Sequence, residues 1–135
     1  MTPIAPKCLA LILCDAVRRD RRTGDLTIVR AFDAFDVPSF PARTGPFCVW
    51  IQLTDGAGRT RMRLLVEYIP PDRLEAELIT MIEFTVEFAD PTTMLGHAAN
   101  VPGGIELGDV GRYRLRLEAD GVTILQRYFI VRQGS

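Results

Sequence analysis

The sequence predicts an all-β fold, namely an antiparallel sandwich of two sheets with about seven to nine strands and no disulfide. Runs of alternating apolar and polar residues recur along the chain, and turn signals rich in Gly, Pro and Asp separate them. No helix is available as the crossover that parallel strands would need. The length of 135 residues fits one domain over residues 1–135.

The first predicted strand is the apolar run CLALILC at residues 8–14, which has the composition of a strand covered on both faces. An export signal that ends on a lipid-modified Cys14 is the alternative. This run is short for such a signal, and Leu13 stands where a small residue is required. We therefore expect a strand, followed by a charged connection over residues 15–24.

The next run, TGDLTIVRAFDAFDV at residues 23–37, is rich in β-forming residues and begins with a turn signal. Its apolar residues fit no single period, which indicates a bulge or a bend. Pro38 and Pro41 end the run.

The clearest predicted hairpin spans residues 47–68, where two alternating runs flank the turn signal Asp55-Gly56-Ala57-Gly58. Alternation sends one set of side chains inward: Phe47, Val49, Ile51, Leu53, Met62, Leu64, Val66 and Tyr68. The outward set is Cys48, Trp50, Gln52, Arg61, Arg63 and Glu67.

Residues 74–88 alternate without interruption, with apolar side chains such as Leu78 on even numbers and Glu residues on odd ones. Fifteen extended residues would reach about 50 Å, which is long for one straight strand. We expect a break near Thr80 that gives two strands. A helix over residues 71–79 is the alternative, since a Pro-Asp opening followed by Glu, Ala and Leu suits one.

The last predicted hairpin spans residues 109–131 and turns at Asp120-Gly121, and part of the loop before it is expected to form a short strand. It begins with DVGRY, in which Asp109, Gly111 and Tyr113 resemble the tyrosine corner of immunoglobulin-like sandwiches. Leu115 stands where immunoglobulin domains carry a cysteine, so the resemblance implies an immunoglobulin-like sandwich without its disulfide.

A second resemblance covers nearly the whole chain. The ordered segments LALILCDAVRRD, TGDLTIVRAFDAF, FP, IQLTDGAGRTRMRL, FADP and GRYRLRLEADGVTILQRYFIV are similar to a family of small, uncharacterised bacterial proteins of unknown function. This resemblance implies a soluble β-sandwich and brings no catalytic residues with it.

Composition excludes several classes of protein. A net charge of -1 gives no overall field that would attract nucleic acid or anionic lipid, so we expect neither as a partner. No run is long enough to span a membrane as a helix. The three cysteines are odd in number and form no CxxC pair, which favours a reduced, cytoplasmic location.

Catalytic and metal-binding constellations are also missing. His97 is the only histidine, so a two-histidine metal site is impossible within one chain. The cysteines lie in predicted strands, where free thiols are usually buried and inert. The aspartates stand mostly at turns, where they bond backbone amides. We therefore expect a protein that is not an enzyme and has no cofactor and no metal.

Arginines form the one candidate binding face. Arg112, Arg114 and Arg116 alternate along one strand and would project from one side of it. In an immunoglobulin-like layout this strand neighbours the one that carries Trp50. The predicted face is Trp50, Arg61, Arg63, Arg112, Arg114 and Arg116, suited to a partner's carboxylates or an anionic ligand. A solvated outer face with arginines paired to Glu67 and Glu118 is the alternative.

The sequence thus favours a non-enzymatic module that acts through contacts with an unidentified protein partner or with a second copy as a homodimer. An edge strand, or the outward residues Ile79 and Met81, would provide the contact. The alternative function is the binding of a small ligand or anion at the Trp and Arg face.

Overall fold

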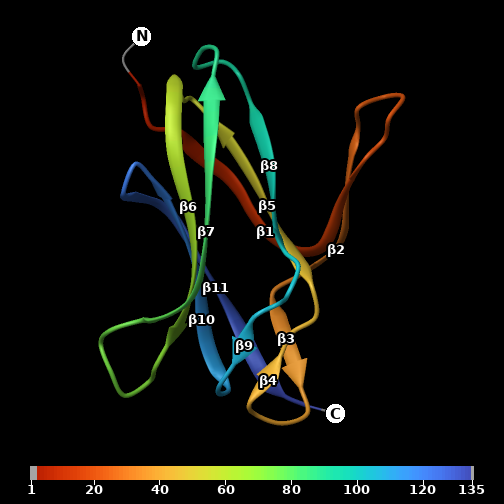
Figure 1. The fold of residues 1–135 in the computed structure, drawn as a ribbon, viewed down its shortest axis with the longest axis vertical. Helices are drawn as coiled ribbons and strands as arrows, with labels where there is room; N and C mark the ends of the chain where they lie inside the picture. The colour runs from red at the N-terminus through yellow and green to blue at the C-terminus, as the bar shows by residue number, and fades with distance from the viewer. Residues whose placement is uncertain (1–2, 135) are drawn as a thin grey trace.

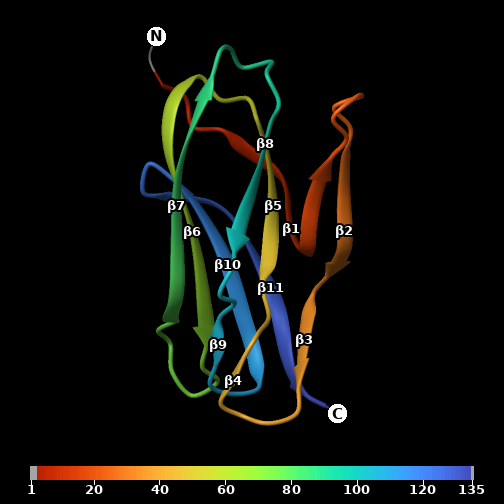
Figure 2. The same cartoon turned by 45° about the vertical axis from the view of Figure 1, so that its right-hand side comes forward.

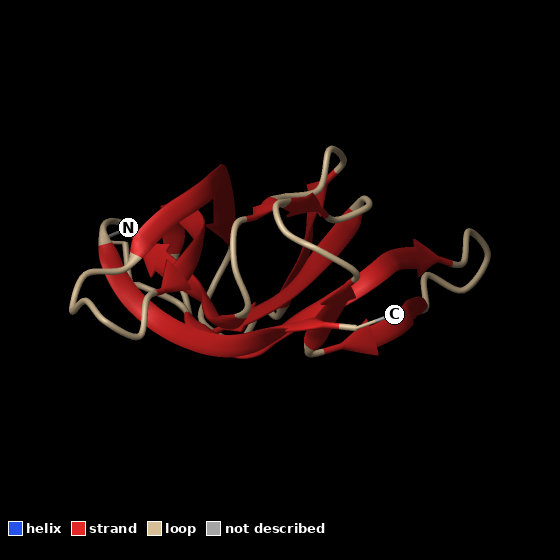
Figure 3. Cartoon of the chain, turned by 90° about the horizontal axis from the view of Figure 1, so that it is seen from below, coloured by secondary structure: helices blue, strands red, loops and turns tan. Residues whose placement is uncertain are grey.

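The computed structural model describes residues 3–134, and its regular structure consists of strands (Figures 1 and 3). Their bounds are β1 Lys7–Arg19, β2 Leu26–Phe32, β3 Ala34–Val37, β4 Ala42–Arg43, β5 Phe47–Thr54, β6 Gly58–Ile69, β7 Glu77–Phe88, β8 Leu95–Val101, β9 Glu106–Leu107, β10 Gly111–Ala119 and β11 Val122–Gln133. Residues 3–134 contain no helix, so none there is long and apolar enough to cross a membrane. The all-β prediction is confirmed, and the helix considered over residues 71–79 is absent.

The strands form three sheets. One has four strands in the order β2-β1-β5-β8, one has five in the order β3-β11-β10-β6-β7, and the third is the short pair β4-β9. Figure 2 shows the five-stranded sheet and the strands β5 and β8 as separate layers. With eleven strands in the described residues, the chain has more than the seven to nine expected.

The pairing within the five-stranded sheet is mixed. β3 pairs with β11 in parallel, and every other registered strand pair is antiparallel. The prediction of a wholly antiparallel fold was therefore wrong for this one pair. Its parallel register covers Ala34 to Val37 only, and the connection between the two strands runs through other strands instead of a helix.

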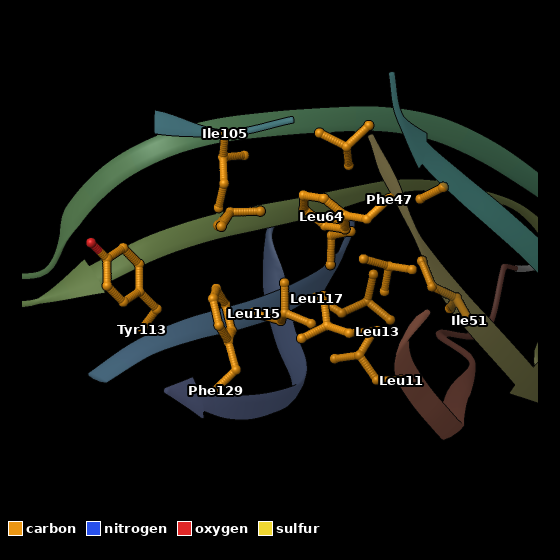
Figure 4. Close-up of a cluster of buried hydrophobic side chains, with 14 of the residues drawn as sticks. Leu11, Leu13, Phe47, Ile51, Leu64, Ile105, Tyr113, Leu115, Leu117 and Phe129 are labelled. Carbon is orange, nitrogen blue, oxygen red and sulfur yellow. The ribbon is translucent and has the colours of Figure 1, made fainter. Parts of the chain in front are cut away.

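The interior lies between the two large sheets. Figure 4 shows Leu11, Leu13 and Ile51 of the four-stranded sheet pointing toward Leu115 and Leu117 of the five-stranded sheet. Tyr113, Phe129, Met62, Leu64 and Val66 complete the five-stranded side of this core, and all are 2% exposed or less. Burial on this scale is the main favourable term in the stability of the fold.

In residues 47–68, the alternation of apolar and polar residues predicts which side chains face the core, but it does not predict which strands pair with each other. The predicted inward residues of β5 and β6 do face the common core, as expected. The two strands nevertheless belong to different sheets: β5 pairs with β1 and β8, whereas β6 pairs with β7 and β10. The hairpin prediction was therefore wrong. The connection at residues 55–57 crosses between the layers, and the Gly56 Cα lies against the ring of Phe88.

β1 is a single long strand that includes the predicted run at residues 8–14. It pairs with β5 up to Cys14, and with β2 from Leu13 to Arg19. Residues 15–30 comprise the end of β1 beyond its last pair with β5, the turn that follows, and the first part of β2. We call this segment the arm, and it projects away from the other strands in Figures 1 and 2. The charged connection expected over residues 15–24 is thus strand as far as Arg19 and turn only at its tip.

β7 is one strand, not the two that the length of its alternating run suggested. The expected irregularity is present near Thr80, because the register with β6 shifts between Val66 and Glu67. This shift reverses the faces of the residues before Thr80. Leu78 is exposed, and Ile79 packs against the core, which is the opposite of the predicted arrangement.

Candidate functional site

The predicted arginines lie on the outer surface of the five-stranded sheet. Arg112, Arg114 and Arg116 alternate along β10 with Tyr113, Leu115 and Leu117, which are buried in the core. β10 lies between β11 and β6, and β6 supplies Arg61 and Arg63. We call this surface the arginine face, and it comprises Leu65, Glu67, Arg61, Arg63, Leu78, Met81, Glu83, Arg112, Arg114, Arg116, Glu118, Tyr128 and Ile130.

A network of ion pairs occupies its centre. The Glu67 carboxylate accepts hydrogen bonds from the Arg114 Nε at 3.0 Å and the Arg116 Nε at 3.1 Å. Arg116 also donates from Nη1 to Glu118 at 2.7 Å. Arg63 lies 3.3 Å from Glu83 and 3.9 Å from Glu118. Three arginines are therefore neutralised by three glutamates. This is the pairing described above for the alternative of a solvated outer face.

Burial and hydrogen bonding act in opposite directions on Glu67. Burial raises the pKa of its carboxyl group, but the hydrogen bonds from Arg116 and Arg114 lower the pKa more, so the result lies below the ordinary value. The same contacts, mainly the hydrogen bond to Glu67, raise the pKa of Arg116. The network is therefore ionised at neutral pH and holds its guanidinium groups in fixed positions.

The two remaining arginines of the face have different surroundings. The Arg112 guanidinium lies 4.5 Å from the centroid of the Tyr128 ring, a cation–π arrangement. Arg61 makes no side-chain ion pair to any described residue, and it lines a shallow hollow of about 530 Å³ together with Arg63, Glu83 and Asp120. The two acidic residues there offset the charge of the two arginines.

Apolar side chains flank the ion pairs on both sides. Leu78 and Met81 of β7 are 54% and 38% exposed, and Tyr128 and Ile130 of β11 are 42% and 41% exposed. The sequence did not assign Leu78, Tyr128 or Ile130 to this face. The outward orientation of Tyr128 and Ile130 could have been predicted, because they alternate in β11 with the apolar residues Phe129 and Val131. The outward orientation of Leu78 could not, because it results from the shift in the β6–β7 register.

Trp50 does not belong to the arginine face, and the prediction that placed it there was wrong. It is only 7% exposed and lies on β5, in the four-stranded sheet, where its indole covers Gly96 of β8. Cys14 and Cys48 are its buried neighbours in a small separate cluster. Because β10 pairs with β6 and β11, no arginine of β10 is adjacent to Trp50 in a sheet.

The DVGRY segment forms a local structural motif. The Tyr113 hydroxyl donates a hydrogen bond of 2.9 Å to the backbone carbonyl of Asp109, and Tyr113 is buried. Gly111 has a φ of 131°, a backbone conformation that residues with a side chain rarely adopt. The hydrogen bond joins the Tyr113 side chain to the backbone that immediately precedes β10.

The residues considered for catalysis do not converge. The His97 imidazole stacks on the Phe84 ring with a centroid separation of 4.0 Å, and burial lowers its pKa. Cys8, Cys14 and Cys48 are free thiols whose pKa values are raised by burial. Within residues 3–134, no group of three or more His, Cys, Asp or Glu side chains is placed to hold a metal ion.

Comparison with known proteins places the chain in a family. The model of a family described as a family of unknown function, DUF6941, matches residues 9–132, which is nearly the whole chain. The sequence matches no curated protein.

Among solved structures, β-glucosidases match most of this chain with a small part of their own length. A β-glucosidase from Listeria innocua in complex with isofagomine is 8% identical, with 96% of this chain and 16% of that chain covered and a TM-score of 0.48. A β-D-glucoside glucohydrolase from Trichoderma reesei is 11% identical, with 93% and 18% covered and a TM-score of 0.48. The chain spans less than a fifth of these enzymes, so the likeness assigns no activity.

Proposed function

We propose that this chain, which belongs to the family of unknown function DUF6941, is a non-enzymatic immunoglobulin-like β-sandwich module that acts in the cytoplasm through protein contacts. The arginine face is the contact surface in this proposal, and a second copy of the chain is its occupant. The Tyr113 hydrogen bond to Asp109 and the two facing sheets support the immunoglobulin-like assignment.

The observation that carries the proposal is the placement of Leu78, Met81, Tyr128 and Ile130. These four exposed apolar side chains lie on one sheet surface, on either side of a neutral ion-pair network. Protein interfaces are enriched in aromatic residues, Met and Arg. An outward sheet face that only meets water usually carries separate polar side chains instead.

The order of the strands supports a two-fold pairing of two copies. The sheet order is β11-β10-β6-β7, so β10 and β6 are central and the apolar residues lie at the two sides. A two-fold axis between β10 and β6, parallel to the strands, places β7 of one copy over β11 of the other. Leu78 then faces Tyr128 of the second copy, and Met81 faces Gln126, the residue at its own level in β11.

The same rotation places charges of opposite sign together. Arg114 and Glu67 are opposite each other in the β10–β6 register, so each Arg114 comes to face the Glu67 of the second copy. The contact is therefore self-complementary in charge, as an isologous interface requires. Four strands about 4.8 Å apart and about 30 Å long cover roughly 600 Å², similar in scale to the ~800 Å² per partner of standard interfaces.

Sedimentation equilibrium tests the proposal. The unmodified chain is expected to form a dimer, and Leu78→Glu or Tyr128→Glu is expected to weaken the dimer by at least tenfold. Leu74→Glu and Val122→Glu are matched controls, because both positions are highly exposed but lie outside the arginine face. A chain that remains monomeric at all accessible concentrations, or controls that weaken the dimer equally, would overturn the proposal.

Anion binding is the second candidate function, and the hollow beside Arg61 is the observation that favours it. Arg61 is the one arginine there without a side-chain ion pair to a described residue. Calorimetric titration with inorganic phosphate is the test, because Trp50 is too buried to report on this surface. Binding that disappears in Arg61→Gln and persists in Arg59→Gln supports this function, and absence of heat from the unmodified chain excludes it for phosphate.

A further inference from the structure

Cys14 and Cys48 lie directly opposite each other on β1 and β5, as the last registered pair of that antiparallel ladder. Residues that face each other across antiparallel strands have Cα atoms about 4.5 or 5.5 Å apart. A disulfide requires a Cα separation of about 4.4–6.8 Å. The backbone is therefore positioned for a disulfide, although both side chains are free thiols in this structure.

The two side chains share one environment, whereas the third cysteine has another. Cys14 and Cys48 are both buried with Trp50 in the cluster on the outer side of the four-stranded sheet. Cys8 packs instead against the main core and donates from Sγ to the Ala10 carbonyl. Because opposite residues project on the same side of a sheet, only Cys14 and Cys48 are arranged for pairing.

We propose that Cys14 and Cys48 form a two-electron redox site that closes to a cross-strand disulfide on reaction with a small-molecule disulfide such as oxidised glutathione. One cysteine thiolate attacks the oxidant, which forms a mixed disulfide and releases one glutathione. The second thiolate then displaces the other glutathione and forms the Cys14–Cys48 bond. Both electrons pass to the oxidant, and the two thiol protons leave with the two released glutathione thiols.

Hydrogen bonding between the two thiols favours Cys14 as the first nucleophile. Burial raises the pKa of both groups, that of Cys48 to about 11. The hydrogen bond from Cys48 lowers the pKa of Cys14 and thus opposes the effect of burial there. Thiolate, not thiol, is the attacking species, so Cys14 is the better placed of the pair.

Access to the pair depends on the arm. Val17 and Ile28 of the arm pack against the cluster that contains Cys14 and Cys48. Because this pair ends the β1–β5 ladder, movement of the arm at its base exposes the thiols without separating the rest of the sheet. Reaction is therefore expected to be slow in the native protein and accelerated by mild denaturant. Once formed, the disulfide ties the base of the arm to β5.

Oxidation of the purified chain with oxidised glutathione tests this proposal, with peptide mapping under non-reducing conditions. The expected product has lost two hydrogens, contains a peptide pair linked through Cys14 and Cys48, and retains one free thiol at Cys8. Trp50 is the only tryptophan and lies in the same cluster, so quenching of its emission by the disulfide should accompany the mass change. The thermal midpoint should rise by roughly 5 to 15 °C.

Two variants provide the controls. Cys8→Ala should form the linked peptide pair at the same rate, and Cys14→Ala should show neither the mass change nor the quenching. The proposal is wrong if the unmodified chain, opened by mild denaturant and allowed to refold with the oxidant, yields only glutathione adducts. Links that involve Cys8, or links between two molecules, would equally exclude the site.

Discussion

The Trp50 indole lies directly against the Cα of Gly96, so a Cβ at position 96 would overlap the ring. The two residues are on neighbouring strands β5 and β8. This close approach explains how a tryptophan on the outer side of a sheet becomes buried: its neighbour has no side chain. The outer side of the four-stranded sheet is therefore packed around Trp50 and does not present it to a ligand.

Gly96→Ala is expected to destabilise the fold by about 1–3 kcal/mol, because the indole must move to accept the methyl group. Urea denaturation followed by Trp50 fluorescence measures this loss, and the native emission should shift toward that of exposed indole. Gly103→Ala is the matched control, since a Cβ at position 103 would meet nothing within 4 Å. Equal effects of the two substitutions would contradict the packing described for Trp50.

Tyr113→Phe is expected to cost about 0.5–1.5 kcal/mol, because it removes the hydroxyl that bonds the Asp109 carbonyl and keeps the buried ring. Thermal denaturation measures the loss. Tyr128→Phe removes a hydroxyl from an exposed ring and keeps the contact of that ring with Arg112, so it should be nearly neutral. An unchanged midpoint in Tyr113→Phe would show that the hydrogen bond does not stabilise the start of β10.

Glu67→Gln is expected to destabilise the chain by about 1–3 kcal/mol at pH 7, because Arg114 and Arg116 lose their shared carboxylate. The pKa of Glu67 is lower in the folded chain, so its contribution is present above the unfolded value of about 4.3 and disappears as the pH falls through the folded pKa. The difference in unfolding free energy between the two proteins should therefore shrink below about pH 4.

Glu87→Gln is the control for this pH dependence. Glu87 is exposed on β7 and makes no ion pair within the described residues. It should leave stability nearly unchanged at pH 7. A difference between Glu67→Gln and the unmodified chain that stays constant from neutral to acidic pH would mean that the ion pairs of Glu67 contribute nothing.

The faces of the strands were predictable from the sequence because side chains alternate with a period of two. Phe47 and Met62 reach the core as that pattern requires, and Asp120-Gly121 forms the turn of the β10–β11 hairpin. The partners of the strands were not predictable in the same way. A short glycine-containing connection can join two paired strands or cross between sheets, and only contacts distant in sequence decide between them.

The candidate site was predictable in part for the same reason. Arg112, Arg114 and Arg116 share a surface with Arg61 and Arg63 because β10 and β6 are paired. Trp50 was misplaced because its assignment depended on an expected strand order. Leu78 was missed because one shifted register between β6 and β7 reverses the faces of the residues beyond it, and local alternation contains no sign of that shift.

Photocrosslinking from position 78 tests the central claim most directly. A benzophenone amino acid replaces Leu78, and isotopically labelled and unlabelled chains are mixed so that links between copies can be distinguished from links within one. The proposed two-fold pairing predicts links from position 78 to the part of β11 around Tyr128 in the second copy. Links confined to one copy, or links to the outer side of the four-stranded sheet, would contradict the claim that the arginine face joins two copies.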